Sequence, residues 1–125
     1  MSAHRQGDTF RQDCPCRALL DVVAGKWSAL VIEALRNGPM RFGSLQRRIE
    51  GVSAKVLTAT LKRLEDAGLI DRRVYAEVPV RVEYSLTEFG VSAAQPLREL
   101  RIWAESHYDQ AEAYVHGQTQ QPNND

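Results

Sequence analysis

The sequence predicts a mostly helical α+β fold in which helices precede and follow one small β-hairpin. Apolar residues recur at intervals of three and four over much of residues 13–68, which is typical of amphipathic helices. After Gly68 the pattern changes to alternation at residues 70–74 and 82–86, and Pro79 lies in the break between these runs. The chain has 125 residues, of which 43% are hydrophobic, so it is long enough to bury one core.

Two supporting helices are predicted at the start of the folded region. The first begins at Pro15, because proline is favoured at the first helical position, and it ends at Gly25. The second begins near Lys26 and ends before Gly38 and Pro39. We expect one domain at residues 13–116, after a flexible arm at residues 1–12 and before a disordered tail at residues 117–125.

A short third helix at residues 42–49 and a longer fourth helix at residues 53–68 follow. Ser53 is a favourable N-cap for the fourth helix, and Gly68 ends it. Leu57, Leu61 and Leu64 share its apolar face. The opposite face combines small and basic side chains, namely Ala54, Lys55, Thr58, Ala59 and Lys62, with Arg63 on the flank. This face has no large apolar residue, which indicates a polar partner.

The alternating segments predict a hairpin, and another helical region follows it. Arg72, Arg73 and Arg81 lie near the expected turn of the hairpin. Thr87 is expected to cap a further helix, which Pro96 interrupts. From there apolar residues recur at steps of three and four, a pattern typical of a coiled-coil-like interface between subunits. The predicted dimer interface comprises Leu97, Leu100, Trp103, Ala104, His107, Ala111 and Tyr114. The alternative is that this helix packs only within its own subunit.

The charge is distributed unevenly along the chain. Sixteen basic residues balance sixteen acidic ones, so the net charge does not indicate a nucleic-acid partner. Residues 41–63, however, contain six lysines and arginines and a single acidic residue, Glu50, whereas acidic residues outnumber basic ones beyond residue 97. The sequence therefore has a basic middle and an acidic end.

Short helices followed by an arginine-bearing hairpin, in this order, predict a winged helix-turn-helix that binds double-stranded DNA. In that arrangement residues 42–49 cross the DNA backbone, and the helix after Ser53 lies in the major groove. The hairpin arginines would contact phosphates or the adjacent minor groove. The predicted DNA-binding residues are Arg41, Ser53, Ala54, Lys55, Thr58, Lys62, Arg63, Arg72, Arg73 and Arg81. The alternative is that these side chains form an ordinary solvated helix face.

The chain resembles the HxlR-type transcription regulators, a branch of the winged-helix proteins related in architecture to the MarR regulators. The resemblance covers residues 14 to about 103 and is carried by Gly25-Lys26-Trp27, Arg41-Phe42-Gly43-Ser44-Leu45, Gly51-Val52-Ser53 and the segment from Val78 to Thr87. It implies a homodimer that binds an inverted repeat in a promoter through its winged helices, most simply as a repressor, with dimer contacts from the first and last helices. Val80 stands where a second proline is more usual in the family.

Two cysteines, Cys14 and Cys16, flank Pro15 and are candidates for redox sensing. Cys14 matches the usual family cysteine, and this resemblance implies a sensor of oxidants or of electrophiles such as quinones and aldehydes. Exposed amides and the helix dipole at the start of the first helix favour a thiolate there. We expect a disulfide within one chain to be strained across Pro15, so an adduct or a bond between subunits is favoured. The alternative is a packing role for Cys14.

Other classes of function are less well supported by the sequence. His4, His107 and His116 lack metal-ligand spacing to the cysteines, so neither a metal nor a cofactor is expected. No phosphate loop, nucleotide-binding motif or nucleophile-base pair indicates an enzyme. No apolar segment approaches the length of a membrane span or a signal peptide, so we expect a cytoplasmic, nucleoid-associated protein. A small-molecule effector between the dimer helices, or a winged helix used only for protein contacts, stays open.

Overall fold

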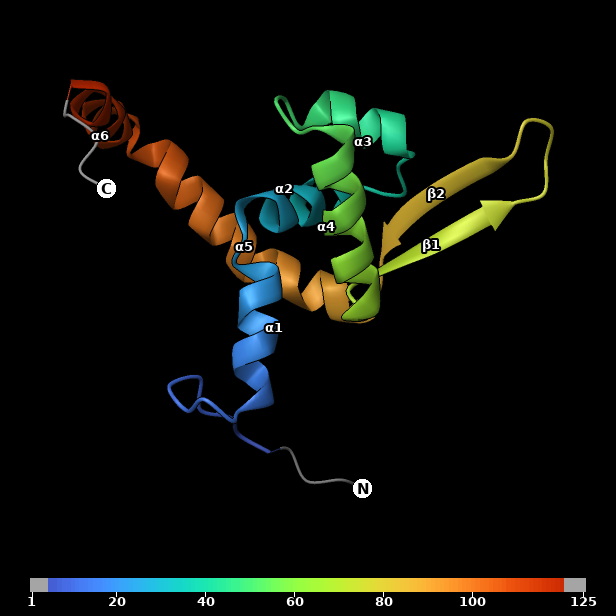
Figure 1. Ribbon diagram of the computed structural model, residues 1–125, viewed down its shortest axis with the longest axis horizontal. Helices are drawn as coiled ribbons and strands as arrows, with labels where there is room; N and C mark the ends of the chain where they lie inside the picture. Colours follow the sequence, from blue (N-terminus) through green and yellow to red (C-terminus); the bar gives the residue numbers. More distant parts are fainter. Residues whose placement is uncertain (1–4, 121–125) are drawn as a thin grey trace. The chain divides into compact units, whose positions relative to one another are not determined.

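The described part of the chain, residues 5–120 in this computed structural model, contains six helices and one antiparallel hairpin (Figure 1). The elements in chain order are α1 (Pro15–Val23), α2 (Lys26–Leu35), α3 (Phe42–Arg48), α4 (Ala54–Asp66), β1 (Ile70–Tyr75), β2 (Arg81–Leu86), α5 (Glu88–Ser106) and α6 (Tyr108–Gln120). The predicted mostly helical fold with a single hairpin is confirmed.

The chain divides into two compact units, Met1–Ala94 and Gln95–Asp125. This division lies within α5 and inside the range 13–116 that we expected to be one domain. The expected arm is described from residue 5 onward, where the backbone N–H of Arg11 donates to the carbonyl of Asp8 in a turn (3.1 Å). Residues 1–4 of this arm lie outside the described residues.

The core of the first unit is built from the apolar faces of α2, α3 and α4. Helix α2 packs against both α3 and α4, and α4 also contacts β1. The side chains that are almost fully buried are Val31, Ile32, Leu35, Leu45, Leu57, Leu61, Leu64, Leu69 and Ile70. Those on the helices are the apolar positions at helical spacing, so their burial follows directly from the sequence pattern, whereas Leu69 precedes β1 and Ile70 begins it. The opposite face of α4 is thereby left to solvent.

The hairpin is attached to the helices at both of its ends. Gly68 ends α4 with a φ of 77°, a left-handed conformation that glycine adopts without a steric cost. Thr87 then joins the hairpin to α5, because its Oγ1 accepts a hydrogen bond from the Gly90 N–H (3.0 Å) and donates to the Gly68 carbonyl (2.7 Å). The expected capping role of Thr87 is confirmed.

A short extended segment before α3 adds a contact that the sequence did not predict. Met40 and Tyr84 form an antiparallel bridge, in which the Met40 N–H donates to the Tyr84 carbonyl (2.9 Å) and the Tyr84 N–H donates to the Met40 carbonyl (2.8 Å). The hairpin is therefore fixed to the segment that leads into α3.

Helix α5 does not stop at Pro96, so the expected interruption there is wrong. Ser92 and Pro96 both lie at exposed positions, and water can therefore solvate the carbonyl that proline leaves without an N–H partner. The break comes later, at His107, whose Nδ1 lies 2.7 Å from the Trp103 carbonyl, while the Ser106 Oγ donates to the Ile102 carbonyl (2.7 Å). Both side chains compete with the backbone for carbonyls of the last turn.

Helix α6 continues to Gln120, so residues 117–120 of the expected disordered tail are helical. A single glycine, Gly117, costs a helix only about 1 kcal/mol relative to alanine. The first proline of this region is Pro122, which lies outside the described residues together with the rest of residues 121–125.

Candidate nucleic-acid interface

Helix α4 presents the predicted polar face to solvent. The Ser53 Oγ accepts a hydrogen bond from the Val56 N–H (3.1 Å), so the predicted N-cap is confirmed and fixes where the helix begins. With its leucines buried, the exposed positions of α4 and its cap include Ser53, Ala54, Lys55, Thr58, Ala59, Lys62 and Arg63. The side chains at the first turns are short or flexible, which lets the helix approach base edges closely.

The three cations of this face differ in their surroundings. The Lys62 Nζ donates to Asp66 Oδ1 (2.9 Å), and this carboxylate raises the pKa of Lys62 above its ordinary value. Arg63 pairs with Asp21 of α1. Lys55, in contrast, has no ion pair within the described part of the chain and lies in the first turn of α4. Of the three, Lys55 has the positive charge that is most available to a phosphate.

Further exposed arginines lie on and before α3. Arg41 is the N-terminal flanking residue of this helix, and Arg47 and Arg48 lie in its last turn. Arg47 donates to the Ser44 Oγ (3.4 Å). Leu45 and Ile49 are buried beneath the helix, and this burial holds Arg47 and Arg48 on the solvent side. The predicted site included Arg41 but not Arg47 or Arg48, although their outward direction follows from the same helical spacing.

The hairpin brings Arg72 and Arg73 to the surface but not Arg81. The side chain of Arg81 is only 28% exposed, and its guanidinium lies 3.9 Å from the centre of the Tyr75 ring. It also pairs with Glu77 (3.3 Å) and with Glu83 (3.6 Å). Acidic groups of the hairpin itself thus surround Arg81, and its expected contact with DNA stays a prediction.

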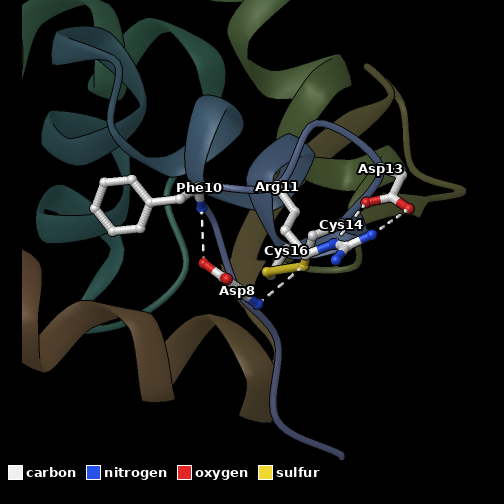
Figure 2. A network of polar contacts seen from close by, with 6 residues as sticks. All are labelled: Asp8, Phe10, Arg11, Asp13, Cys14 and Cys16. Carbon is white, nitrogen blue, oxygen red and sulfur yellow. Dashed lines mark hydrogen bonds and ion pairs between the residues drawn. A yellow bond between two sulfur atoms is a disulfide. The ribbon is translucent and has the colours of Figure 1, made fainter.

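Cys14 and Cys16 form a disulfide within one chain, whereas an adduct or a bond between subunits was expected (Figure 2). Their Cα atoms are 5.4 Å apart, inside the usual range for a disulfide. Cys14 is the N-terminal cap of α1 and Pro15 its first residue, as predicted. The Asp8 N–H donates to the Cys14 Sγ (3.3 Å), so the preceding turn folds back onto the pair.

An ion pair completes this turn. The Arg11 side chain donates to both carboxylate oxygens of Asp13, at 3.1 and 3.3 Å (Figure 2). Because this hydrogen bond stabilises the carboxylate, it lowers the pKa of Asp13. The Asp13 carboxylate thus lies directly before the cysteine pair, and Arg11 compensates its charge.

The second unit carries the predicted dimer residues on α5 and α6. Leu100, Trp103, Ala104, Ala111 and Tyr114 are exposed, and Leu97 and His107 are half-buried. Further large apolar side chains that were not predicted are also exposed, namely Ile102, Tyr108 and Val115. Because the helix breaks at His107, the apolar residues are divided between two helices and do not form one continuous coiled-coil stripe.

The first unit combines a capped helix with a small, basic outer face, a short basic helix before it and a hairpin that follows, which together define a winged helix-turn-helix protein. Residues 22–112 match the HxlR-like helix-turn-helix family, and the chain belongs to this family of transcription regulators. Membership implies that the protein binds DNA and places it among regulators, not enzymes.

Comparisons with individual proteins agree with this family. The chain is 41% identical over 101 residues to the HTH-type transcriptional regulator YtfH of Escherichia coli K12, covering 81% of this chain and 80% of the relative. A solved structure of YtfH from Salmonella typhimurium has a TM-score of 0.80 at 38% identity, covering 89% of this chain and 99% of the other. The redox regulator HypR in its oxidized form has a TM-score of 0.70 at 37% identity, covering 75% and 97%.

No group of three or more histidine, cysteine, aspartate or glutamate side chains is arranged to hold a metal ion in residues 5–120. His4 lies outside this range. None of the helices described is both long and apolar enough to cross a membrane.

Proposed function

We propose that the protein is a homodimeric repressor that binds an inverted repeat in double-stranded DNA through α4 and the hairpin of each subunit. The observation that carries this proposal is the exposure of large apolar side chains in the second unit. Leu100 and Trp103 are each 60% exposed, and Tyr108 and Tyr114 are each 67% exposed. Several large apolar side chains exposed on one small unit are typical of a surface that binds another protein.

A second copy of the chain fits this surface better than another partner, because sequence-specific DNA binding by the first unit requires a second unit of the same kind. One recognition helix reads only a few base pairs, so high sequence specificity needs a second reading helix. A two-fold axis repeats the same contact about 34 to 36 Å away, one helical turn along the duplex, and therefore matches an inverted repeat. Binding of such a dimer across a promoter would hinder polymerase.

The experiment combines the oligomeric state with DNA selection. Sedimentation of the full chain is expected to give a dimer, and selection from random duplexes is expected to return inverted repeats. Trp103→Glu should yield a monomer that binds the selected duplex at least about tenfold more weakly. Gln110→Glu adds the same charge at another exposed position and should leave both properties unchanged. A monomeric wild-type chain, or enrichment of no sequence, would contradict the proposal.

We also propose that the Cys14–Cys16 pair makes DNA binding sensitive to oxidants. The disulfide within the chain supports this, as does the similarity to a protein described as a redox regulator in its oxidized form. The two thiols would lose two protons and two electrons to form the bond, and an azo oxidant such as diamide would take them up to become a hydrazine. A single thiol could instead add to an electrophile such as a quinone.

Four measurements of duplex affinity separate these possibilities. Diamide should lower the affinity of the wild type for the selected duplex, and dithiothreitol should restore it. Cys14→Ser and Cys16→Ser should each abolish the response to diamide, since either substitution removes one sulfur of the bond. If Cys16→Ser responds fully, Cys14 acts alone, and the intrachain bond is not the switch. If both variants respond fully, neither thiol is the sensor.

A further inference from the structure

We propose that Arg81 is a positioning residue of the hairpin, and that Arg72 and Arg73 make the phosphate contacts of this element. This inference rests on the proposed function, in which the hairpin approaches DNA. It assigns a role to Arg81 that differs from the one expected from its charge. Three observations carry it: the contacts of Arg81, the exposure of Arg72 and Arg73 on β1, and the acidic residue beside the turn.

The first observation is that the guanidinium of Arg81 is already occupied. Tyr75 and Arg81 are the last paired residues of the two strands, and the guanidinium lies over the Tyr75 ring. Such stacking stabilises both side chains. Nη2 faces Glu77 and Nε faces Glu83, so two carboxylates lie beside one cation. A phosphate would have to displace them.

The second observation concerns Arg72 and Arg73. Both are exposed, and neither has an ion pair within the described residues. Arg72 pairs in register with Tyr84, and Arg73 with Glu83. Because neighbouring residues of a strand point to opposite faces, the hairpin offers one arginine on each of its two faces. Whichever face meets the duplex, an arginine other than Arg81 is available.

The third observation explains why the hairpin needs Arg81. Glu77 is exposed beside the turn, next to Val78, which is fully exposed, and near Val80, which is 64% exposed. A carboxylate at this place would repel phosphates when the turn approaches DNA. The pairing with Arg81 compensates this charge within the hairpin and also ties the turn to the end of the ladder. The contribution of Arg81 to DNA binding is thus indirect.

The decisive experiment is a double-mutant cycle between Arg81 and Glu77, measured as affinity for a duplex selected with the wild type. Arg81→Gln should weaken binding, because it leaves Glu77 uncompensated. Adding Glu77→Gln to this variant should recover about fivefold or more in affinity, whereas Glu77→Gln alone should change the wild type less than about twofold. If Glu77→Gln raises the affinity of the wild type as much as that of Arg81→Gln, Arg81 contacts DNA directly, and the proposal is overturned.

Two further measurements test the phosphate contacts of Arg72 and Arg73 and the effect of Arg81 on the turn separately. Arg73→Gln or Arg72→Gln should lower the slope of log affinity against log salt by about 0.9, the value for one phosphate contact, and if neither does so the proposal is overturned. The backbone ¹⁵N nuclear Overhauser effect at residues 76–78 and 80, which have an amide N–H, should fall in Arg81→Gln but not in Arg73→Gln, and an unchanged value would remove the positioning role. This last readout needs no DNA, so it tests the hairpin even if the chain binds no duplex and the proposed function fails.

Discussion

Arg63 of α4 pairs with Asp21 of α1, with 3.5 Å between Nη2 and Oδ2. The pair links α4 to α1, the first helix of the same unit, which also packs against α4. Both side chains are well exposed, so the pair contributes at most about 1 kcal/mol to the free energy of unfolding. Its larger effect is electrostatic, because Asp21 places a negative charge beside the face of α4 that we propose binds DNA.

Asp21→Asn is therefore expected to raise the affinity for the selected duplex by about two- to fivefold, while stability to urea changes by less than about 1 kcal/mol. Fluorescence anisotropy at several salt concentrations measures the first effect. Asp109→Asn removes the same charge from an exposed residue of α6 and serves as the control. If Asp21→Asn has no effect while Arg63→Gln lowers the salt slope by about 0.9, then Arg63 binds DNA independently of Asp21.

Loss of the Ser53 cap of α4 should lower the stability of the protein. Ser53→Ala removes the oxygen that accepts the Val56 N–H bond, which is expected to lower the free energy of unfolding by about 1 kcal/mol. Urea unfolding followed by circular dichroism measures this loss. Ser53→Asp restores an acceptor at the cap and should recover the stability. An equal loss in both variants would show that the cap bond does not stabilise α4.

The elements of the first unit could be predicted because each is marked by local chemistry. Pro15 begins a helix, Ser53 caps one, and Gly68 ends one, and these signals act within one or two turns of the chain. Exposure of Lys55 likewise follows from the spacing of the buried leucines on the same helix.

Contacts between distant residues could not be predicted in this way. The charge of Arg81 is visible in the sequence, but the stacking of its guanidinium on the Tyr75 ring depends on the register of the hairpin. The bridge between Met40 and Tyr84 joins segments far apart in the chain. The break at His107 was missed because apolar spacing continues across it, whereas the capture of the Trp103 carbonyl by the histidine depends on its side-chain conformation.

Gly90 is needed where α5 passes close to the start of the hairpin. A methyl group at this position would overlap the carbonyl oxygen of Leu69, which is backbone and cannot move aside easily. Gly90→Ala is therefore expected to lower the free energy of unfolding by about 1–3 kcal/mol. Gly117→Ala is the matched control, because nothing lies within 4 Å of the added methyl group in α6. It should stabilise its helix by about 0.5–1 kcal/mol.

Thermal unfolding of both variants measures this difference. The midpoint should fall clearly for Gly90→Ala, and it should stay constant or rise for Gly117→Ala. A Gly90→Ala protein as stable as the wild type would mean that α5 can move away from Leu69 without cost.

Gly7 lies against the cysteine pair, and this contact should control how fast the disulfide is reduced. A Cβ atom at Gly7 would lie 2.5 Å from the Cys16 Sγ and 3.1 Å from the Cys14 Sγ. In Gly7→Val the turn over the pair must therefore move away, which opens the sulfurs to a reductant. Because thiol-disulfide exchange depends on access to the sulfur, dithiothreitol should reduce the bond several-fold faster in the variant.

The rate of reduction can be followed by trapping free thiols with an alkylating reagent and measuring the mass of the intact protein by mass spectrometry at each time point. Thr9→Val introduces the same side chain at an exposed position of the same turn and should leave the rate unchanged. Equal rates in Gly7→Val and the wild type would show that the turn does not cover the pair in solution. Since no DNA is present, this result is independent of the effect of oxidation on operator binding.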